Sequence, residues 1–364
     1  MYNESGYEKN VKCKQKGAVS LEYTISITNR CNLHCSYCYE RHLNTEFGCI
    51  SDETAEKIID FINRRHDAGT VYLFGGEPLL YSDRVKQFIE RIDDGREYVI
   101  TTNGTLLDED FVKWCFEESG KNVRINMSHD GKTCADRGAD PDLLDEKVKM
   151  LLKYQEDTLI QLVYTEQTLP DLYDNVLHLQ GLGVKNVSAA LDGFASPADP
   201  DSFGDLMREQ WDKLAHLRGV SMHELTAKRK FIKENIRPKC EICKKKVYIN
   251  WDGNFYPCIQ FQNLSGFRCG DVNTGILTKE AEKAHPDYSV MSARCEGCEI
   301  REYCRNSCAC RKMGTTGTLT DISEAACMEE QVHILTALEQ IAESHRRKKK
   351  TEEKPVKQSG KSVT

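Results

Sequence analysis

Residues 22–40 read EYTISITNRCNLHCSYCYE, a β-branched and aromatic run followed by three closely spaced cysteines. The run predicts a buried strand, so Cys31, Cys35 and Cys38 fall in the loop at its C-terminal end. Their spacing is Cys-x3-Cys-x2-Cys. Three thiolates in such a loop can ligate three irons of a cubane cluster and leave the fourth iron open to a ligand from outside the chain.

The sequence around this loop alternates short β-branched or aromatic runs with segments whose apolar residues recur at helical spacing, as far as Leu191. Six such strand–helix units predict a parallel sheet with helices outside it. Six are too few to close an eight-stranded barrel. We therefore expect an α/β fold, a partial (β/α)6 barrel of the TIM type, with its chemistry at the C-terminal ends of the strands.

Short polar motifs stand directly after three further predicted strands. They are Gly75-Gly76-Glu77-Pro78 after the second strand, Thr101-Thr102-Asn103-Gly104 after the third, and Ser128-His129-Asp130-Gly131 after the fourth. The C-terminal ends of parallel strands meet at one edge of a sheet. These motifs are therefore expected beside the cysteine loop.

The chain has 17 cysteines in 364 residues, which is far more than an ordinary soluble protein carries. In a reducing compartment such thiols indicate metal binding, because thiolates are soft ligands for iron–sulfur clusters and zinc. Zinc is the competing interpretation of the first loop, with His34 or His42 as a fourth ligand.

The overall charge is −7 and the sequence pI is about 5.9, which does not favour nucleic acid as a partner. The opening residues, MYNESGYEKNVKCKQKG, lack the charged-then-apolar pattern of a secretory leader. No apolar run reaches the roughly 18 residues that a membrane span requires. We expect a cytoplasmic protein with no nucleic-acid or membrane partner.

Composition divides the chain into five parts. They are an N-terminal extension at 1–20, the barrel at 21–191, a bridge at 192–236, a cysteine-rich domain at 237–330, and a terminal helix with a basic tail at 331–364. The terminal helix is expected to pack on the barrel or bridge, without chemistry of its own. The charged last residues predict a solvated tail.

The cysteine-rich domain holds ten of the cysteines. Its text VYINWDGNFYPC predicts a hairpin that turns at Asp252-Gly253. A pair of zinc ribbons is one interpretation of this region. Its cysteine spacings are Cys243-x9-Gly253-x4-Cys258, then Cys295-x2-Cys298-x5-Cys304-x3-Cys308, and finally Cys327.

The first cysteine loop resembles the motif of the radical S-adenosylmethionine (SAM) superfamily, including the aromatic Tyr37 before the third cysteine. The GGEP, TNG and S-x-D-G motifs are similar to elements at the same strands of that family. The resemblance implies that Cys31, Cys35 and Cys38 hold a [4Fe–4S] cluster. This cluster would cleave SAM reductively to methionine and a 5′-deoxyadenosyl radical, which abstracts hydrogen from a substrate.

The resemblance also implies a set of SAM-binding residues. Gly75 and Gly76 would let the backbone approach the methionine amino group, which an acid helps to bind. Ser128 would contact the ribose or carboxylate, and Arg137 would pair with the carboxylate. Asn103 and Asp130 are also readable as plain turn residues. The full implied set is Tyr37, Gly75, Gly76, Glu77, Pro78, Asn103, Ser128 and Arg137.

The second region resembles the seven-cysteine SPASM domain in every spacing, which implies two auxiliary [4Fe–4S] clusters. One would use Cys295, Cys298, Cys304 and Cys327. The other would use Cys243, Cys258 and Cys308, with Cys240, Cys269 or an open iron completing it.

Cys13, Cys49, Cys115, Cys134 and Cys310 fit no ligand pattern. Of these, Cys115 is expected to be a small buried apolar residue, and Cys134 to be either an unreactive or a reactive thiol near the site.

Proteins that resemble the chain in both regions mostly modify peptides. The resemblance implies maturation of a ribosomally made peptide by thioether or carbon–carbon crosslinking or by epimerisation, with flavodoxin or ferredoxin as reductant. A separate leader-recognition protein is a further expected partner. The basic run Arg346–Lys350 is either an attractor for an acidic leader or part of the solvated tail.

Three alternatives stay open. Sulfatase maturases place an aspartate directly after the cysteine that Cys258 matches, where this chain has Ile259 and then Gln260. Dehydrogenation of a small molecule is the second alternative. An iron–sulfur electron-transfer protein without radical chemistry is the third.

Overall fold

The computed structural model describes residues 22–43, 46–65, 69–93, 95–236, 246–264, 266–276, 292–304 and 308–352. The expected N-terminal extension, Cys13, Cys240, Cys243 and the tail beyond residue 352 lie outside these described residues.

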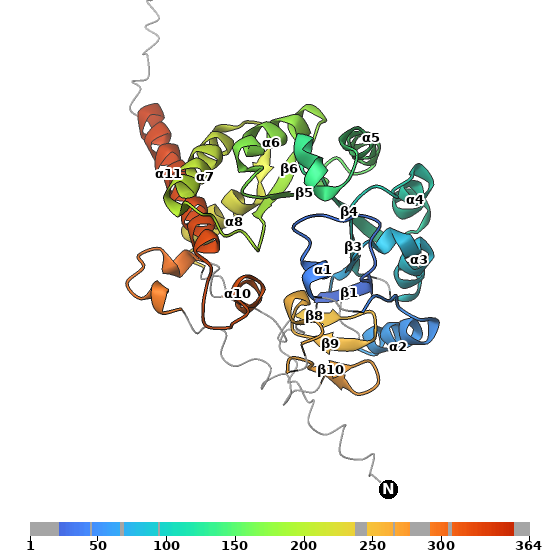
Figure 1. Ribbon diagram of the computed structural model, residues 1–364. Helices are drawn as coiled ribbons and strands as arrows, with labels where there is room; N and C mark the ends of the chain where they lie inside the picture. Colours follow the sequence, from blue (N-terminus) through green and yellow to red (C-terminus); the bar gives the residue numbers. More distant parts are fainter. Residues whose placement is uncertain are drawn as a thin grey trace, which may run out of the picture.

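Seven parallel strands form the barrel part of the sheet, in the order β1 to β7 (Figure 1). The six strands predicted from the alternation are all present. The seventh, β7, has two residues and lies in the expected bridge, where a strand this short leaves no periodic signal. The bounds are β1 Glu22–Thr28, β2 Val71–Gly75, β3 Glu97–Thr102, β4 Asn122–Ser128, β5 Leu159–Tyr164, β6 Asn186–Leu191 and β7 Ser221–Met222.

Helices cover the outer face of these strands. In α2, Ser51 accepts a hydrogen bond from the backbone of Thr54 and so caps the first turn. The same helix buries Ala55, Ile58 and Ile62, which recur at helical spacing. The bounds of these helices are α2 Asp52–Asn63, α3 Ser82–Arg91, α4 Glu109–Lys113, α5 Pro141–Leu152, α6 Leu172–Gly181, α7 Pro200–His216 and α8 His223–Lys233. The short helix α1 (Tyr39–Leu43) follows the cysteine loop and does not cover this face.

The cysteine-rich part extends the same sheet on its other side. Strand β8 (Lys246–Ile249) pairs in parallel with β1, and β9 (Asn254–Tyr256) folds back against β8. The predicted hairpin turn is present, with Gly253 at φ 84°, where glycine avoids strain. Strands β10 (Gly270–Asp271) and β11 (Gly275–Ile276) complete a sheet of eleven described strands.

Two helices end the described chain, α10 (Ala309–Thr316) and α11 (Glu324–Glu352). Helix α11 packs along α7 and α8, as expected for the terminal helix (Figure 1). It extends to Glu352, so the basic run Arg346–Lys350, one interpretation of which placed it in a solvated tail, is helical. Arg and Lys are good helix formers, which explains the extension. No helix of the described residues is long and apolar enough to cross a membrane.

Candidate active site

A cavity of about 610 Å³ opens at the C-terminal ends of the strands. Its wall also includes residues of α10 and α11. Most of the SAM-site residues expected from the sequence meet here. The expected residues that line it are Cys31, Cys35, Tyr37, Cys38, Gly75, Gly76, Asn103, Ser128, Arg137 and Cys308.

The three cysteines of the first loop are free thiols. Burial raises the pKa of Cys31, and it raises the pKa of Cys35 to about 11 despite the opposing charge of Arg137. The loop by itself therefore does not stabilise the thiolate forms of Cys31 and Cys35, whereas a bound metal would do so. Among the described residues, these sulfurs belong to no set of three ligand atoms within 4.8 Å of one another. Tetrahedral zinc needs sulfurs about 3.8 Å apart, so the donor set fits a cubane better than zinc.

The glycines after β2 pack against the start of the cysteine loop. A Cβ at Gly75 would lie 2.1 Å from the carbonyl oxygen of Thr28, and one at Gly76 would lie 2.3 Å from that of Arg30. The Gly76 amide donates to the Thr28 carbonyl at 2.7 Å. These glycines therefore fix the cysteine loop to β2 as well as lining the cavity.

Glu77 is fully buried and does not line the cavity. Its Oε1 accepts from the Leu79 amide at 2.9 Å and the Thr102 hydroxyl at 2.8 Å, and its Oε2 accepts from the Asn103 amide at 2.7 Å. Burial raises its pKa to about 7 against these hydrogen bonds. Pro78, at the start of the next turn, is also buried outside the cavity wall. Glu77 thus joins the loops after β2 and β3.

Asn103 is nearly buried and faces the first cysteine. Its Nδ2 lies 3.7 Å from the Cys31 sulfur and donates to Asn32 Oδ1 at 2.9 Å. Its Oδ1 accepts from the Thr105 amide at 3.0 Å. The side chain therefore orients the cysteine loop, which goes beyond the role of a turn residue.

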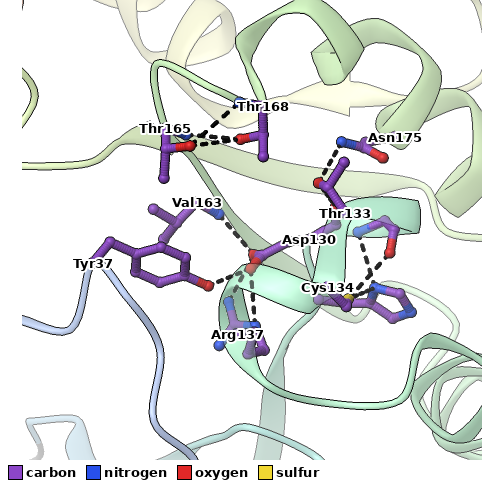
Figure 2. Close-up of polar contacts among 11 residues, drawn as sticks. Tyr37, Asp130, Thr133, Cys134, Arg137, Val163, Thr165, Thr168 and Asn175 are labelled. Carbon is purple, nitrogen blue, oxygen red and sulfur yellow. Dashed lines mark hydrogen bonds and ion pairs between the residues drawn. The ribbon is translucent and has the colours of Figure 1, made fainter.

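Asp130 organises the loop after β4 (Figure 2). Arg137 donates to both of its oxygens, with Nε at 3.1 Å and Nη2 at 2.7 Å, and the Val163 amide donates at 3.0 Å. Burial raises the pKa of Tyr37, whose hydroxyl stays protonated and donates to the same carboxylate. The sequence motif pointed to this position, but its role as a shared acceptor depends on contacts between β4, β5 and the cysteine loop.

Arg137 lines the cavity while its Nε and Nη2 are held by Asp130. Within the described part of the chain, its Nη1 has no hydrogen-bond acceptor. The guanidinium is thus fixed in orientation with one nitrogen left for a ligand.

His129 and His178 both contact one oxygen of Asp145, each from Nε2 at 2.9 Å. This cluster has metal-binding donor types and lies outside the cavity wall. However, His129 Nδ1 accepts from the Gly131 amide at 3.0 Å, so the proton of a neutral ring lies on Nε2. That proton blocks the nitrogen a metal would need. The cluster therefore holds the Ser128–Gly131 loop in place.

Cys115 and Cys134, which lie outside the ligand patterns, are buried. Burial raises the pKa of Cys115 and that of Cys134 to about 12 each. Cys115 is a core residue, as predicted. The Cys134 thiol donates to the Gly131 carbonyl at 3.1 Å, which supports the interpretation of this residue as an unreactive thiol (Figure 2).

The C-terminal cysteines approach the cavity from a different side. Cys308 directly precedes α10 and lines the cavity together with Cys310. The Cys310 thiol donates a hydrogen bond to the Cys258 sulfur and lowers the pKa of Cys258. Cys310 is thus a site residue that the spacing did not reveal. Cys269 is instead buried in the main hydrophobic core.

The last cysteine set lies on short turns and on α11. Cys295 ends one 3-10 turn, Cys304 follows another, and Cys327 lies on α11. Burial, and then the charges of Cys295 and Cys298, raise the pKa of Cys327, so these thiols lie near one another. Like the first loop, they contain no three sulfurs close enough for a single zinc ion within the described ranges.

Helix α11 also contributes to the cavity wall, which the sequence did not predict. Glu329 lines the wall, accepts from the Tyr164 hydroxyl at 2.9 Å and the Leu191 amide at 2.8 Å, and pairs with Arg311. No spacing in the sequence signals the contacts with Tyr164 and Leu191, because each joins residues more than a hundred positions apart.

Residues 25–131, which carry the cysteine loop and the three motifs, match the model of the Radical SAM superfamily. This segment of the chain is a radical SAM domain. The tungsten-containing aldehyde ferredoxin oxidoreductase cofactor-modifying protein of Pyrococcus furiosus is similar to this chain. It is 26% identical over 320 residues, 77% of this chain and 87% of that protein.

Solved structures show the same fold. Native anSMEcpe with bound AdoMet has a TM-score of 0.73 at 19% identity, covering 90% of this chain and 99% of that chain. Streptococcus suis SuiB bound to precursor peptide SuiA has a TM-score of 0.60 at 17% identity, covering 85% and 76%. The α/β fold with a partial barrel is therefore confirmed. The chain is an enzyme with a radical SAM domain, and the radical SAM family uses SAM and a [4Fe–4S] cluster.

Proposed function

We propose that Cys31, Cys35 and Cys38 ligate the [4Fe–4S] cluster of this enzyme and that the adjoining cavity binds SAM. The observation that carries this proposal is that all three thiols line one cavity with the glycine loop, Ser128 and Arg137. When bound, the reduced cluster supplies the electron that cleaves SAM into methionine and a 5′-deoxyadenosyl radical, which takes a hydrogen atom from the substrate.

In this proposal the chain's own residues bind and orient SAM. The Nη1 nitrogen of Arg137 binds the methionine carboxylate, and Asp130 holds the guanidinium at the required angle. Backbone groups of Gly75 and Gly76 face the amino group, and Ser128 faces the ribose or carboxylate. Glu77 and Asn103 position the loops that carry these contacts.

We further propose two auxiliary [4Fe–4S] clusters that transfer electrons or bind substrate. Cys295, Cys298, Cys304 and Cys327 form one ligand set. Cys243, Cys258 and Cys308 belong to the other, with Cys240 as the proposed fourth ligand. The burial of Cys269 in the core supports leaving that residue out.

The proposed substrate is a ribosomally made peptide, modified by a crosslink or by epimerisation, in the cytoplasm. SuiB, which shares the fold, is described with its precursor peptide bound. Sulfatase maturases carry an aspartate directly after the cysteine that Cys258 matches. This chain has Ile259 there and then Gln260, which lines the cavity, so formylglycine formation is disfavoured. Flavodoxin or ferredoxin is the proposed reductant.

The test is anaerobic reconstitution followed by incubation with SAM and dithionite. We expect 5′-deoxyadenosine, and iron and sulfide near twelve per chain for three cubanes. Absence of 5′-deoxyadenosine would refute the SAM-cleaving site. Iron near four per chain would refute the auxiliary clusters alone. Mass spectrometry of peptides encoded beside the gene, with and without the enzyme, then tests the peptide proposal.

A further inference from the structure

A second hollow, of about 440 Å³, lies between the end of α7, α8 and the distal half of α11. We call it the basic cleft, because five of its lining residues are basic or titrate to a cation. These residues are His216, Arg218, Arg229, Lys233 and Arg347. Figure 1 shows α11 lying along α7 on this side of the molecule.

Three of the cations have no carboxylate partner among the described residues. Arg229 donates to Gln340 Oε1 at 2.5 Å and Thr226 Oγ1 at 2.9 Å, which are both neutral groups. Burial lowers the pKa of Arg229, as expected for a partly desolvated cation without a counter-ion. Arg218 and Lys233 form no ion pair within the described ranges.

The acid that lines the cleft, Glu343, is already engaged. It contacts Arg347 at 3.3 Å and His216 Nε2 at 3.6 Å. The cleft therefore keeps an excess of positive charge in a chain whose formal net charge is −7. Such a local reversal of sign attracts an acidic ligand.

We propose that the basic cleft binds an acidic segment of the polypeptide substrate, away from the residues that are modified. This inference rests on the proposed peptide substrate. A peptide fits better than nucleic acid because Leu217, Ile341 and Glu343 also line the cleft. Nucleic-acid binding draws on many phosphate contacts along a longer basic surface, which an acidic chain does not offer.

Helix α11 connects the cleft to the active site. Glu329 lines the cavity and Ser344 lines the cleft, so the two sites are separated by a helix rise of about 22 Å. An extended peptide covers that distance with about seven residues. The acidic segment and the modified residue of a substrate should therefore be at least about seven residues apart.

The experiment measures fluorescence anisotropy of a short labelled peptide of alternating glutamate and leucine, with the glutamine–leucine peptide as its control. The variant Arg218→Gln/Arg229→Gln/Lys233→Gln removes the unpaired cations. Lys113→Gln/Lys147→Gln/Lys149→Gln removes the same charge from α4 and α5, which do not line the cleft. Circular dichroism checks that both variants are folded.

We expect the acidic peptide to bind the wild type, with weaker binding in rising salt. The cleft variant should bind at least about tenfold more weakly, and the control variant should bind as the wild type does. Equal binding by the cleft variant would overturn the proposal, as would no binding to the wild type. Tighter binding of a single-stranded DNA of equal charge would also overturn it. Failure of SAM cleavage in the wild type would instead refute the proposed function, because the binding assay needs no SAM.

Discussion

The cysteine loop after β1 and the C-terminal cysteine region both place thiols near one cavity, but different structures hold them there. In the first region all three thiols come from one loop, which is fixed by Gly76, Asn103 and Asp130 on neighbouring strand ends. In the second, the thiols come from a hairpin, short turns and two helices. The barrel shapes the first site, whereas in the second region the proposed auxiliary clusters would join its segments. We therefore expect the two regions to respond differently to mutation.

The largest expected effect is loss of the first site. Replacing Cys31, Cys35 and Cys38 together by Ala should abolish 5′-deoxyadenosine formation and leave about eight irons per chain. High-performance liquid chromatography and iron analysis measure the two results. Cys49→Ala is the control, because Cys49 does not line the cavity. Retained cleavage in the triple variant would refute the central assignment.

The matching change in the second region should separate loss of an auxiliary cluster from loss of SAM cleavage. Cys295→Ala/Cys298→Ala removes two proposed ligands, so about four irons should be lost. SAM cleavage without a peptide should persist, since the barrel holds the first cysteine loop independently. The same two assays apply. An unchanged iron content would contradict the ligand set, and lost cleavage would contradict the independence of the regions.

The contacts of Asp130, which hold the first cysteine loop in place, can be tested by mutation. Asp130→Asn leaves the buried Arg137 without its paired charge, which should cost about 3–5 kcal/mol in the free energy of unfolding. Urea denaturation of the protein measures this. The control is Asp157→Asn, which breaks the exposed pair with Arg124 and should cost less than about 1 kcal/mol. Similar losses in both variants would show that the Asp130 network is not a stabilising centre.

Glu77 should make the free energy of unfolding depend on pH. Its pKa rises from 4.5 to about 7 in the folded state through burial. Between these values the native state binds a proton that the unfolded chain has released, so the free energy of unfolding falls as pH rises. The fall is at most about 3 kcal/mol. In Glu77→Gln, urea denaturation across this window should show a smaller fall.

A part of the pH dependence should remain in Glu77→Gln, because burial also raises the pKa of Glu224 to about 7. The double variant Glu77→Gln/Glu224→Gln should therefore be flatter still. Equal slopes in all three proteins would show that neither carboxyl binds a proton on folding.

The smallest expected effect distinguishes a core cysteine from a ligand. Cys269→Ala should leave the iron content unchanged and cost about 1 kcal/mol of stability, because Cys269 packs in the main core. Iron analysis and urea denaturation test it against Cys258→Ala, which should lose iron. Loss of about four irons from Cys269→Ala would return this residue to the ligand set.

The sequence predicted those features that depend on short-range pattern. Periodicity located the six main strands, the Cys-x3-Cys-x2-Cys spacing located the first loop, and Asp252-Gly253 located the hairpin turn. It did not predict that Glu77 is buried and accepts hydrogen bonds from Thr102 and Asn103 at the end of β3, because that depends on how two loops pack. The contact between Cys310 and Cys258 likewise joins segments that are distant in sequence. The role of Glu329 depends on the docking of α11 across the barrel.

The pairing of β1 with β8 has a consequence for how the protein is made. Glu22 of β1 lies beside Lys246 of β8, so one edge of β1 has no partner until the ribosome has produced two thirds of the chain. An unpaired strand edge invites pairing with other chains, and contacts this distant in sequence form slowly. Chains truncated before β8 should therefore aggregate during synthesis, although they contain every residue of the first cysteine loop. The C-terminal region is in this sense a folding partner of the barrel that it completes.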